Sequence, residues 1–141
     1  MSVSTVMTDN PACCTPSTPV KDVARLMVEN DCGEIPVVED MTSRKLAGVI
    51  TDRDIATRVV ATGQNSAEAL AGDCMTTSCV SVTPETTLAD CCELMEANKI
   101  RRVPVLDAGG GVVGIVSLAD VVRSASASAT AAVVKQVSTD G

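Results

Sequence analysis

The sequence predicts an α/β (α+β) fold in which one β-α-β-β-α unit occurs twice within 141 residues. The first observation behind this prediction is an internal repeat, the pattern that decides an architecture before any other. The segment GVITDRD at 48–54 returns as GIVSLAD at 114–120, an offset of 66 (114 − 48). Both copies contain a glycine, two β-branched residues, a hydroxyl residue, two variable positions and an aspartate.

Upstream residues repeat in the same order, which is the second observation. The segment EIPVVE at 34–39 matches RVPVLD at 102–107, an offset of 68 (104 − 36). The same offset pairs the Met-Thr at 7–8 with the Met-Thr at 75–76. The two-residue slip falls after position 40, where the first copy has a longer turn. Each half would be marginal alone at this size, so the two units are expected to share a core around a pseudo-twofold axis.

The third observation is the order of apolar periodicities in each copy. In the first unit, Thr18 is expected as the N-cap of a helix and Pro19 as its first residue. The elements expected there are a helical turn at 3–7, a strand at 12–15, a helix from 18 to about 30, strands at 35–39 and 46–51, and a helix at 52–61.

The second unit is expected to follow the same plan. A short helix at 67–70 is expected before this unit, which begins near residue 71. Its elements are a strand at 79–82, a helix at 86–98, strands at 103–107 and 112–117, and a helix from 118. The domain boundaries are set at 1–62 for repeat 1, 63–72 for a linker, 73–124 for repeat 2 and 125–141 for a Ser/Ala-rich tail, whose order is left open.

Composition limits the partners of the chain. A net charge of −7 argues against nucleic acid, because phosphate contacts need clustered basic residues. No apolar run approaches ~20 residues and the start has no signal-peptide pattern, so no membrane partner and a cytoplasmic location are expected. The seven cysteines are then expected as reduced core residues, although Cys32, Cys74 and Cys79 near predicted turns leave a redox role open. With no histidine and no C-x-x-C, no metal site is expected.

Two units that run from Met-Thr through h-P-V (h, an apolar residue) to G-h-h-[ST]-x-x-D resemble a tandem CBS-domain pair, or Bateman module, of the stand-alone type known in bacteria and archaea. The resemblance covers nearly the whole chain. It implies a regulatory module that binds an adenosine-containing ligand between its repeats and needs no cofactor. An enzyme is not expected, because the sequence offers no histidine base, P-loop or metal constellation.

Two pairs of residues in the repeated motif have both a structural and a functional interpretation: Thr51 with Asp54, and Ser117 with Asp120. A hydroxyl three residues before an aspartate at a strand-to-helix junction is a capping box, which needs no ligand. The same geometry suits a nucleotide, because a helix N-terminus attracts anions and a carboxylate accepts two hydrogen bonds from a ribose.

The two h-P-V segments have the same ambiguity. Proline indicates a sheet edge, because it cannot donate to a ladder. The resemblance implies that such strands flank an adenine through free backbone groups and aliphatic side chains, which suits a chain with no aromatic residue. The residues concerned are Ile35, Pro36, Val37, Val103, Pro104 and Val105.

Arg101 and Arg102 break the symmetry of the repeat, because their counterparts are Gly33 and Glu34. Guanidinium groups bind phosphate bidentately, and the resemblance implies that basic residues before h-P-V reach a phosphate. A solvated surface pair is the alternative, and the cavity that they serve is left open. Arg53 is a weaker phosphate candidate.

Three functions follow from these patterns. The first is binding of an adenine nucleotide, AMP before ATP, ADP, SAM or NAD. The second is a ligand-free structural or dimerisation module with an unknown protein partner. The third is a thiol protein that responds to oxidation. A homodimer is expected through the helices that follow Asp54 and Asp120, which carry apolar residues.

Overall fold

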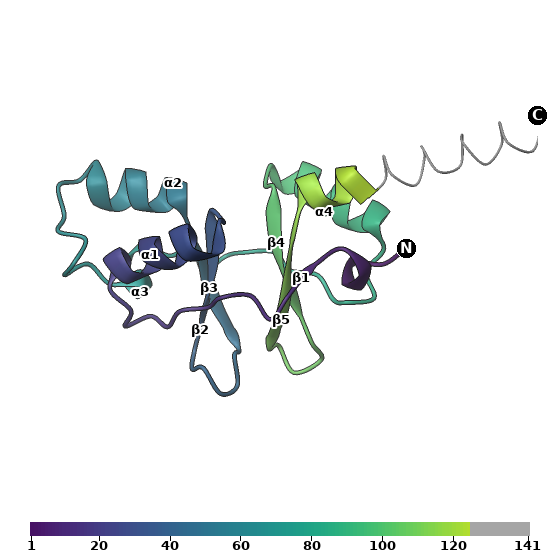
Figure 1. Cartoon of the computed structure of the whole chain (residues 1–141), viewed down its shortest axis with the longest axis horizontal. Helices are drawn as coiled ribbons and strands as arrows, with labels where there is room; N and C mark the ends of the chain where they lie inside the picture. The colour runs from purple at the N-terminus through teal and green to yellow at the C-terminus, as the bar shows by residue number, and fades with distance from the viewer. Residues whose placement is uncertain (125–141) are drawn as a thin grey trace, which may run out of the picture.

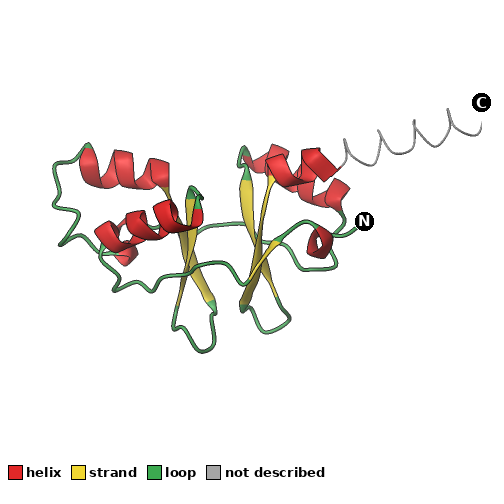
Figure 2. Ribbon diagram, in the orientation of Figure 1, coloured by secondary structure: helices red, strands yellow, loops and turns green. Residues whose placement is uncertain are grey.

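The computed structural model describes residues 1–124, and the open question of the Ser/Ala-rich tail lies outside them. Two β-hairpins stand side by side at the centre, and helices cover their outer sides (Figures 1 and 2). This mixed α/β arrangement of two repeats confirms the predicted fold class. Its elements are η1 (Val3–Thr5), β1 (Thr8–Asp9), α1 (Val20–Asn30), β2 (Glu34–Val38), β3 (Leu46–Thr51), α2 (Asp52–Ile55), the π-helical η2 (Ala56–Val60), α3 (Ala71–Cys74), α4 (Leu88–Asn98), β4 (Arg102–Leu106), β5 (Val112–Ser117) and a helix over 118–124.

The two hairpins have matching registers. In the antiparallel pair β2–β3, Glu34 lies opposite Thr51, and in the pair β4–β5, Arg102 lies opposite Ser117. Each hairpin also contains one register irregularity, after Val37 in β2 and after Val105 in β4. The repeated sequence therefore folds into two copies of one hairpin, with corresponding residues at corresponding ends.

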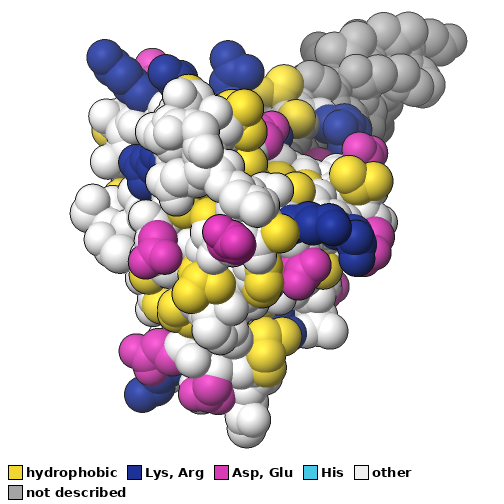
Figure 3. Space-filling view, turned by 90° about the vertical axis from the view of Figure 1, so that its left-hand side faces the viewer, with side chains coloured by type: hydrophobic (Ala, Val, Ile, Leu, Met, Phe, Trp, Pro, Cys, Tyr) yellow, Lys and Arg dark blue, Asp and Glu magenta, His cyan; other side chains and the backbone are white. Residues whose placement is uncertain are grey.

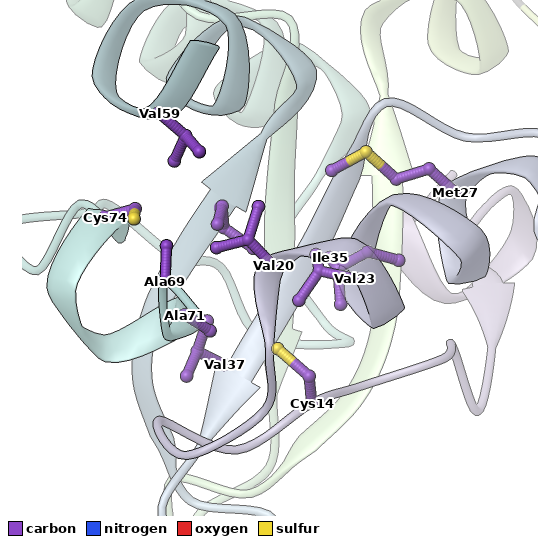
Figure 4. Close-up of a cluster of buried hydrophobic side chains, with 11 residues drawn as sticks. Cys14, Val20, Val23, Met27, Ile35, Val37, Val59, Ala69, Ala71 and Cys74 are labelled. Atoms are coloured by element: carbon purple, nitrogen blue, oxygen red, sulfur yellow. The ribbon is translucent and has the colours of Figure 1, made fainter. Parts of the chain in front are cut away.

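Each repeat is completed by a segment from outside its own hairpin. β1, near the N-terminus, pairs with β5 of the second repeat, while Thr76 forms a bridge with Val49 of the first. Val3 is accordingly buried in the core of the second repeat. In Figure 4, Ala69, Ala71 and Cys74 lie against side chains of the first repeat. The predicted boundaries at 62 and 73 divide the sequence, but the segments that precede each repeat pack across those boundaries.

The two halves share a core where the hairpins meet. Cys13, Val38 and Val112 form one buried cluster, against which Leu46 and Leu106 pack. The Leu46 N–H donates to the Gly110 carbonyl at 3.2 Å, and the Val112 N–H donates to the Arg44 carbonyl at 2.9 Å. Burial of these aliphatic faces against each other supplies the shared core that two marginal halves require.

The first strand predicted in each unit is wrong in extent. Only single parallel bridges form there, Cys14 with Val37 and Val82 with Val105. A proline follows two residues after each bridge, Pro16 and Pro84, and proline cannot donate the next ladder bond. The pairing therefore stops after one residue.

Two helix starts also differ from expectation. Pro19 takes the N-cap position of α1 and has no side-chain oxygen to cap with. The Thr18 hydroxyl, predicted as the cap, accepts from the Thr15 N–H at 3.1 Å instead. In α4 the cap is Thr87, whose hydroxyl accepts from the Asp90 N–H, while the predicted start, Thr86, bonds back to the Thr83 N–H. Both hydroxyls form a local turn that competes with capping.

The short helix predicted at 67–70 lies instead at Ala71–Cys74. Its backbone is anchored to the first repeat, because the Ala71 N–H donates to the Thr18 carbonyl and the Gly72 N–H to the Pro16 carbonyl. This long-range anchoring fixes the position of the helix.

In the described part of the chain, no helix combines the length and the apolar run needed to cross a membrane. Acidic, basic and apolar side chains are interspersed over the outward face of the first repeat (Figure 3).

Candidate functional site

Two cavities lie between the repeats, and the repeat offsets relate most of the residues that line one to residues that line the other. The larger inter-repeat cavity has a volume of about 600 Å³, and the smaller has about 210 Å³. The larger is lined by residues that include Thr8, Asn10, Asn30, Cys32, Glu34, Arg102, Ser117, Asp120 and Arg123. The smaller is lined by residues that include Thr76, Ser78, Asn98, Ile100, Arg102, Glu34, Thr51, Asp54 and Pro104.

The hairpin registers explain why candidate residues from distant parts of the sequence meet. Thr51 and Ser117 end the second strand of each hairpin, and Glu34 and Arg102 begin the first strand directly opposite them. Opposed residues in an antiparallel pair are nearest neighbours. The motif pairs and the charged residues before h-P-V are thus brought to the same end of the two hairpins.

Thr51 and Asp54 form a complete capping box at the start of α2. The Thr51 hydroxyl accepts from the Asp54 N–H at 3.1 Å, and Asp54 Oδ2 accepts from the Thr51 N–H at 3.0 Å. Asp54 Oδ1 lies 3.8 Å from Arg58 Nε, and the side chain is 13% exposed. Oδ2 is therefore hydrogen-bonded to the backbone and Oδ1 lies beside a guanidinium, and the two reciprocal bonds confirm the capping interpretation for this pair.

Ser117 and Asp120 form only half of such a box. The Ser117 hydroxyl accepts from the Asp120 N–H at 3.1 Å, while Asp120 Oδ1 pairs with Arg123 Nη1 at 3.1 Å. Among the described residues, Asp120 Oδ2 accepts no hydrogen bond, and the side chain is 29% exposed. One oxygen of this carboxylate therefore has no hydrogen bond with the described residues, while the Ser117 hydroxyl caps the helix.

The two adjacent arginines have different positions. Arg102 lines both inter-repeat cavities, and its guanidinium packs against Gly33, where a Cβ atom would lie 2.8 Å from Arg102 Nη1. Arg101 is exposed and lines neither cavity; it borders an outer hollow with Leu118 and Val122. Arg53 also lies outside the linings of both cavities.

Glu34 is the buried charged residue at the centre of the site. Its side chain is 7% exposed, and Oε2 has no hydrogen-bond partner within residues 1–124. Burial raises the pKa of Glu34 to about 7, against the lowering effect of Arg102, and Asp54 raises it further. An acid with this pKa exchanges its proton near neutral pH.

The h-P-V side chains serve mainly the cores. Ile35 and Val37 belong to the first core cluster and Val103 and Val105 to the second, while Pro104 lines the smaller cavity. The expectation of free backbone groups is wrong for both prolines. The Pro36 carbonyl accepts from the Cys14 N–H at 3.0 Å, and the Pro104 carbonyl accepts from the Val82 N–H at 3.1 Å. A single bridging residue occupies the strand edge that proline was expected to leave open.

The cysteines show little sign of reactivity. All seven thiols are free, and four of them, Cys13, Cys14, Cys74 and Cys91, are buried. Burial raises the pKa of the thiols of Cys74 and Cys79, two of the three residues for which a redox role was left open. A raised pKa lowers the thiolate fraction that reacts with oxidants. No cluster of three metal-binding side chains occurs in the described chain.

Sequence reasoning missed two residues as members of the site. Arg123 lines the larger cavity and pairs with Asp120, and its position three residues later on a helix was the available signal. Glu34 was noted only as the acidic counterpart of Arg102. The repeat offset of 68 places Glu34 at the position equivalent to Arg102, but the burial of its side chain depends on how the two hairpins pack.

Comparison with known proteins gives the same fold and the same repeats. The chain is 39% identical over 119 residues to the CBS domain-containing protein YhcV of Bacillus subtilis, which covers 84% of this chain and 81% of YhcV. It is 36% identical over 113 residues to CBSX3, a mitochondrial CBS domain-containing protein of Arabidopsis thaliana, covering 79% of this chain but only 54% of CBSX3.

A solved structure of CBSX2 from Arabidopsis thaliana in complex with AMP superposes with a TM-score of 0.74 at 32% identity, covering 88% of this chain and 95% of CBSX2. None of these three names denotes an enzyme. The CBS domain family itself matches residues 3–61 and 71–127, one match for each repeat. The chain therefore belongs to the CBS domain family, as a protein with two CBS repeats.

Proposed function

We propose that this chain is a non-catalytic regulatory module that binds an adenosine-containing ligand in the larger inter-repeat cavity, with AMP as the first candidate. The observation that carries the proposal is the convergence of Ser117, Asp120 and Arg102 on one cavity of about 600 Å³. Small-molecule sites typically have volumes of ~300–1,000 Å³, so the smaller cavity of about 210 Å³ is a weaker candidate. The complex of CBSX2 with AMP supports the choice of ligand.

Each candidate residue has a specific task in this proposal. Asp120 Oδ2 is available to accept hydrogen bonds from the two hydroxyls of a ribose. The Arg102 guanidinium, which forms no hydrogen bond with the described residues, would bind a phosphate bidentately. The adenine is expected against the apolar part of the cavity wall, which includes Ala12, Cys32 and Ile115.

Calorimetric titration tests the proposal, because the chain has no tryptophan or tyrosine for intrinsic fluorescence. AMP is expected to bind with one site per chain, and adenosine to bind more weakly because it lacks the phosphate that Arg102 would hold. ADP, ATP, SAM and NAD complete the panel. If no adenosine compound binds at millimolar concentration, the alternative of a ligand-free structural or protein-interaction module replaces this proposal.

We also propose that the chain forms a homodimer through its outer helices. Val60 on η2 is 68% exposed and Val122 on the helix at 118–124 is 53% exposed, and these are the helices that follow Asp54 and Asp120. A homodimer would bury these apolar side chains between equivalent surfaces of two copies. Light scattering at micromolar concentration is expected to give twice the mass of the chain, and a monomer mass would refute this part.

A further inference from the structure

Glu34 and Arg102 are the two charged positions that both inter-repeat cavities share. They are related by the offset of 68, they begin the first strand of each hairpin, and each lines the larger and the smaller cavity. A symmetric duplication would place two like charges beside the axis. This chain places one carboxyl group and one guanidinium there instead.

These two groups do not satisfy each other. The two ion pairs in residues 1–124 are Arg58 with Asp54 and Arg123 with Asp120, so neither Glu34 nor Arg102 belongs to one. Glu34 Oε2 is buried and unpaired, although buried acceptors are almost always satisfied. The region between the two cavities thus holds one guanidinium without an ion-pair partner and one buried carboxylate without a partner.

The charges around both cavities are unfavourable for a strongly negative ligand. The larger cavity is lined by four carboxyl groups, Asp9, Asp31, Glu34 and Asp120, against the two guanidinium groups of Arg102 and Arg123. In the smaller, Glu34 and Asp54 stand against Arg102 alone. Because Asp54 and Asp120 are already paired with arginines, Arg102 is the cation that remains for a phosphate. One guanidinium matches one phosphate group.

We propose, on the basis of the binding function above, that Glu34 is a specificity-determining residue that restricts the ligand to adenosine compounds with at most one phosphate and excludes nucleoside polyphosphates. The single phosphate binds Arg102. The buried carboxylate of Glu34, which no cation pairs, repels any additional phosphate placed near the axis.

Calorimetry at pH 8 without divalent cations tests this proposal with adenosine, AMP and ATP. The variants are Glu34→Gln, which keeps the size and removes the charge, and Glu39→Gln, the same change at an exposed residue beyond the other end of β2. The wild type and Glu39→Gln should bind AMP more tightly than ATP. Glu34→Gln should raise the affinity for ATP relative to AMP by about tenfold, the order expected when one partly buried like charge is removed.

A second measurement uses the wild type alone and does not depend on how the variant folds. Lowering the pH from 8 to 6 protonates Glu34 and should improve ATP binding relative to AMP. The charged or titratable groups that face Glu34 are Arg102, Asp54 and Cys79, with Asp9, Asp31, Asp120 and Arg123 around the larger cavity.

The outcomes separate this inference from the proposed function. If adenosine and AMP bind but the ratio of ATP to AMP affinity is the same in the wild type and Glu34→Gln, or does not change with pH, the role of Glu34 is refuted and the binding function stands. Wild-type protein that binds ATP as tightly as AMP refutes it as well. If none of the three compounds binds, the proposed function fails, and the inference fails with it.

Discussion

The larger and the smaller inter-repeat cavity are built from equivalent residues of two copies of one unit, yet they differ in volume and in the state of their aspartates. In the smaller cavity, Asp54 is held by a complete capping box and by Arg58. In the larger, Asp120 keeps an oxygen free of hydrogen bonds with the described residues. The same motif therefore serves as a helix cap in one repeat and can serve as both cap and ligand site in the other.

The two aspartates also differ in the arginine that lies beside them. Arg58 lies 3.8 Å from Asp54 and also donates to the carbonyls of Cys74 and Met75, at 3.0 and 3.3 Å. It thereby ties the C-terminal end of α3 to η2 while lying beside Asp54. The equivalent position in the second repeat is Ser124, which has no guanidinium. Asp120 is paired instead with Arg123, which is mostly exposed.

The largest expected effect concerns Glu34, where the two cavities meet. Its pKa is raised from 4.5 to about 7, so the folded state binds a proton more tightly than the unfolded state. The stabilisation is fully present below pH 4.5 and is lost as the pH rises through 7, by about 3 kcal/mol in total. Glu34→Gln should lack this loss. Chemical denaturation at pH 5 and pH 8 measures it, with Glu39→Gln as the control; equal pH dependence in both variants would show that Glu34 is not buried as described.

The next effect concerns Gly48 and Gly114, the first residues of the repeated motif. Each lies close to a segment from outside its own hairpin, at Thr76 and at Met7. A Cβ atom on Gly48 would lie 2.7 Å from the Thr76 carbonyl oxygen, a backbone atom. On Gly114 it would lie 2.5 Å from Met7 Sδ, the end of a flexible side chain. Overpacking typically costs ~1–3 kcal/mol, so Gly48→Ala should destabilise near the top of that range and Gly114→Ala nearer the bottom. Thermal unfolding compares the stabilities of the two variants. A larger loss for Gly114→Ala than for Gly48→Ala would contradict the close approach of the Thr76 backbone to Gly48.

The two aspartates should also differ in their contribution to stability. Asp54→Ala removes a side-chain bond to the Thr51 N–H and should cost ~1 kcal/mol, as lost caps do. Among the described residues, the Asp120 carboxylate accepts no hydrogen bond from the Ser117 N–H, so Asp120→Ala removes no bond to the backbone. Its loss of unfolding free energy should therefore be smaller. Urea denaturation at pH 7 compares the two. Equal losses would mean that Asp120 completes a capping box in solution.

The smallest effect on stability is expected at Gly33. A Cβ atom there would meet only the ends of flexible side chains among its nearest atoms, Asp52 Oδ2 at 2.7 Å and Arg102 Nη1 at 2.8 Å. Gly33→Ala should change the free energy of unfolding by less than ~1 kcal/mol while displacing the guanidinium. AMP affinity should fall and adenosine affinity should not. Gly109→Ala is the control, since its nearest neighbour is Asp107 Oδ1 at 3.5 Å; an equal loss for AMP and adenosine would argue against a phosphate at Arg102.

Much of the fold could be predicted because its signals are local. The strands Leu46–Thr51 and Val112–Ser117 have the predicted bounds, since a short run rich in β-branched residues ends at a hydroxyl that starts a helix. The crossing of β1 to β5 could not be predicted, because a two-residue strand has no periodicity of its own. The same limit applies to α3, which is positioned by bonds to Thr18 and Pro16 far away in the sequence.

The sequence predicted which residues belong to the candidate site better than it predicted how they are paired and buried. The repeat identified the pairs Thr51/Asp54 and Ser117/Asp120, and the structure brings both pairs to inter-repeat cavities. Sequence could not show that Arg58 engages Asp54, that Arg101 lies outside both cavities, or that Glu34 is buried without a partner. These states depend on side-chain packing between elements that are distant in the chain.

The most direct test of the account is calorimetric titration of AMP into the wild type, Asp120→Ala and Asp54→Ala. Charge-assisted hydrogen bonds contribute ~1.5–3 kcal/mol each, so loss of Asp120 should weaken AMP binding by at least about tenfold, which needs only ~1.4 kcal/mol. Asp54→Ala should leave the affinity within about twofold of the wild type, because its carboxylate is already engaged by Thr51 and Arg58. The reverse pattern would assign the ligand to the smaller cavity, and unchanged affinity in both variants would show that neither aspartate binds the ligand; either result contradicts the account.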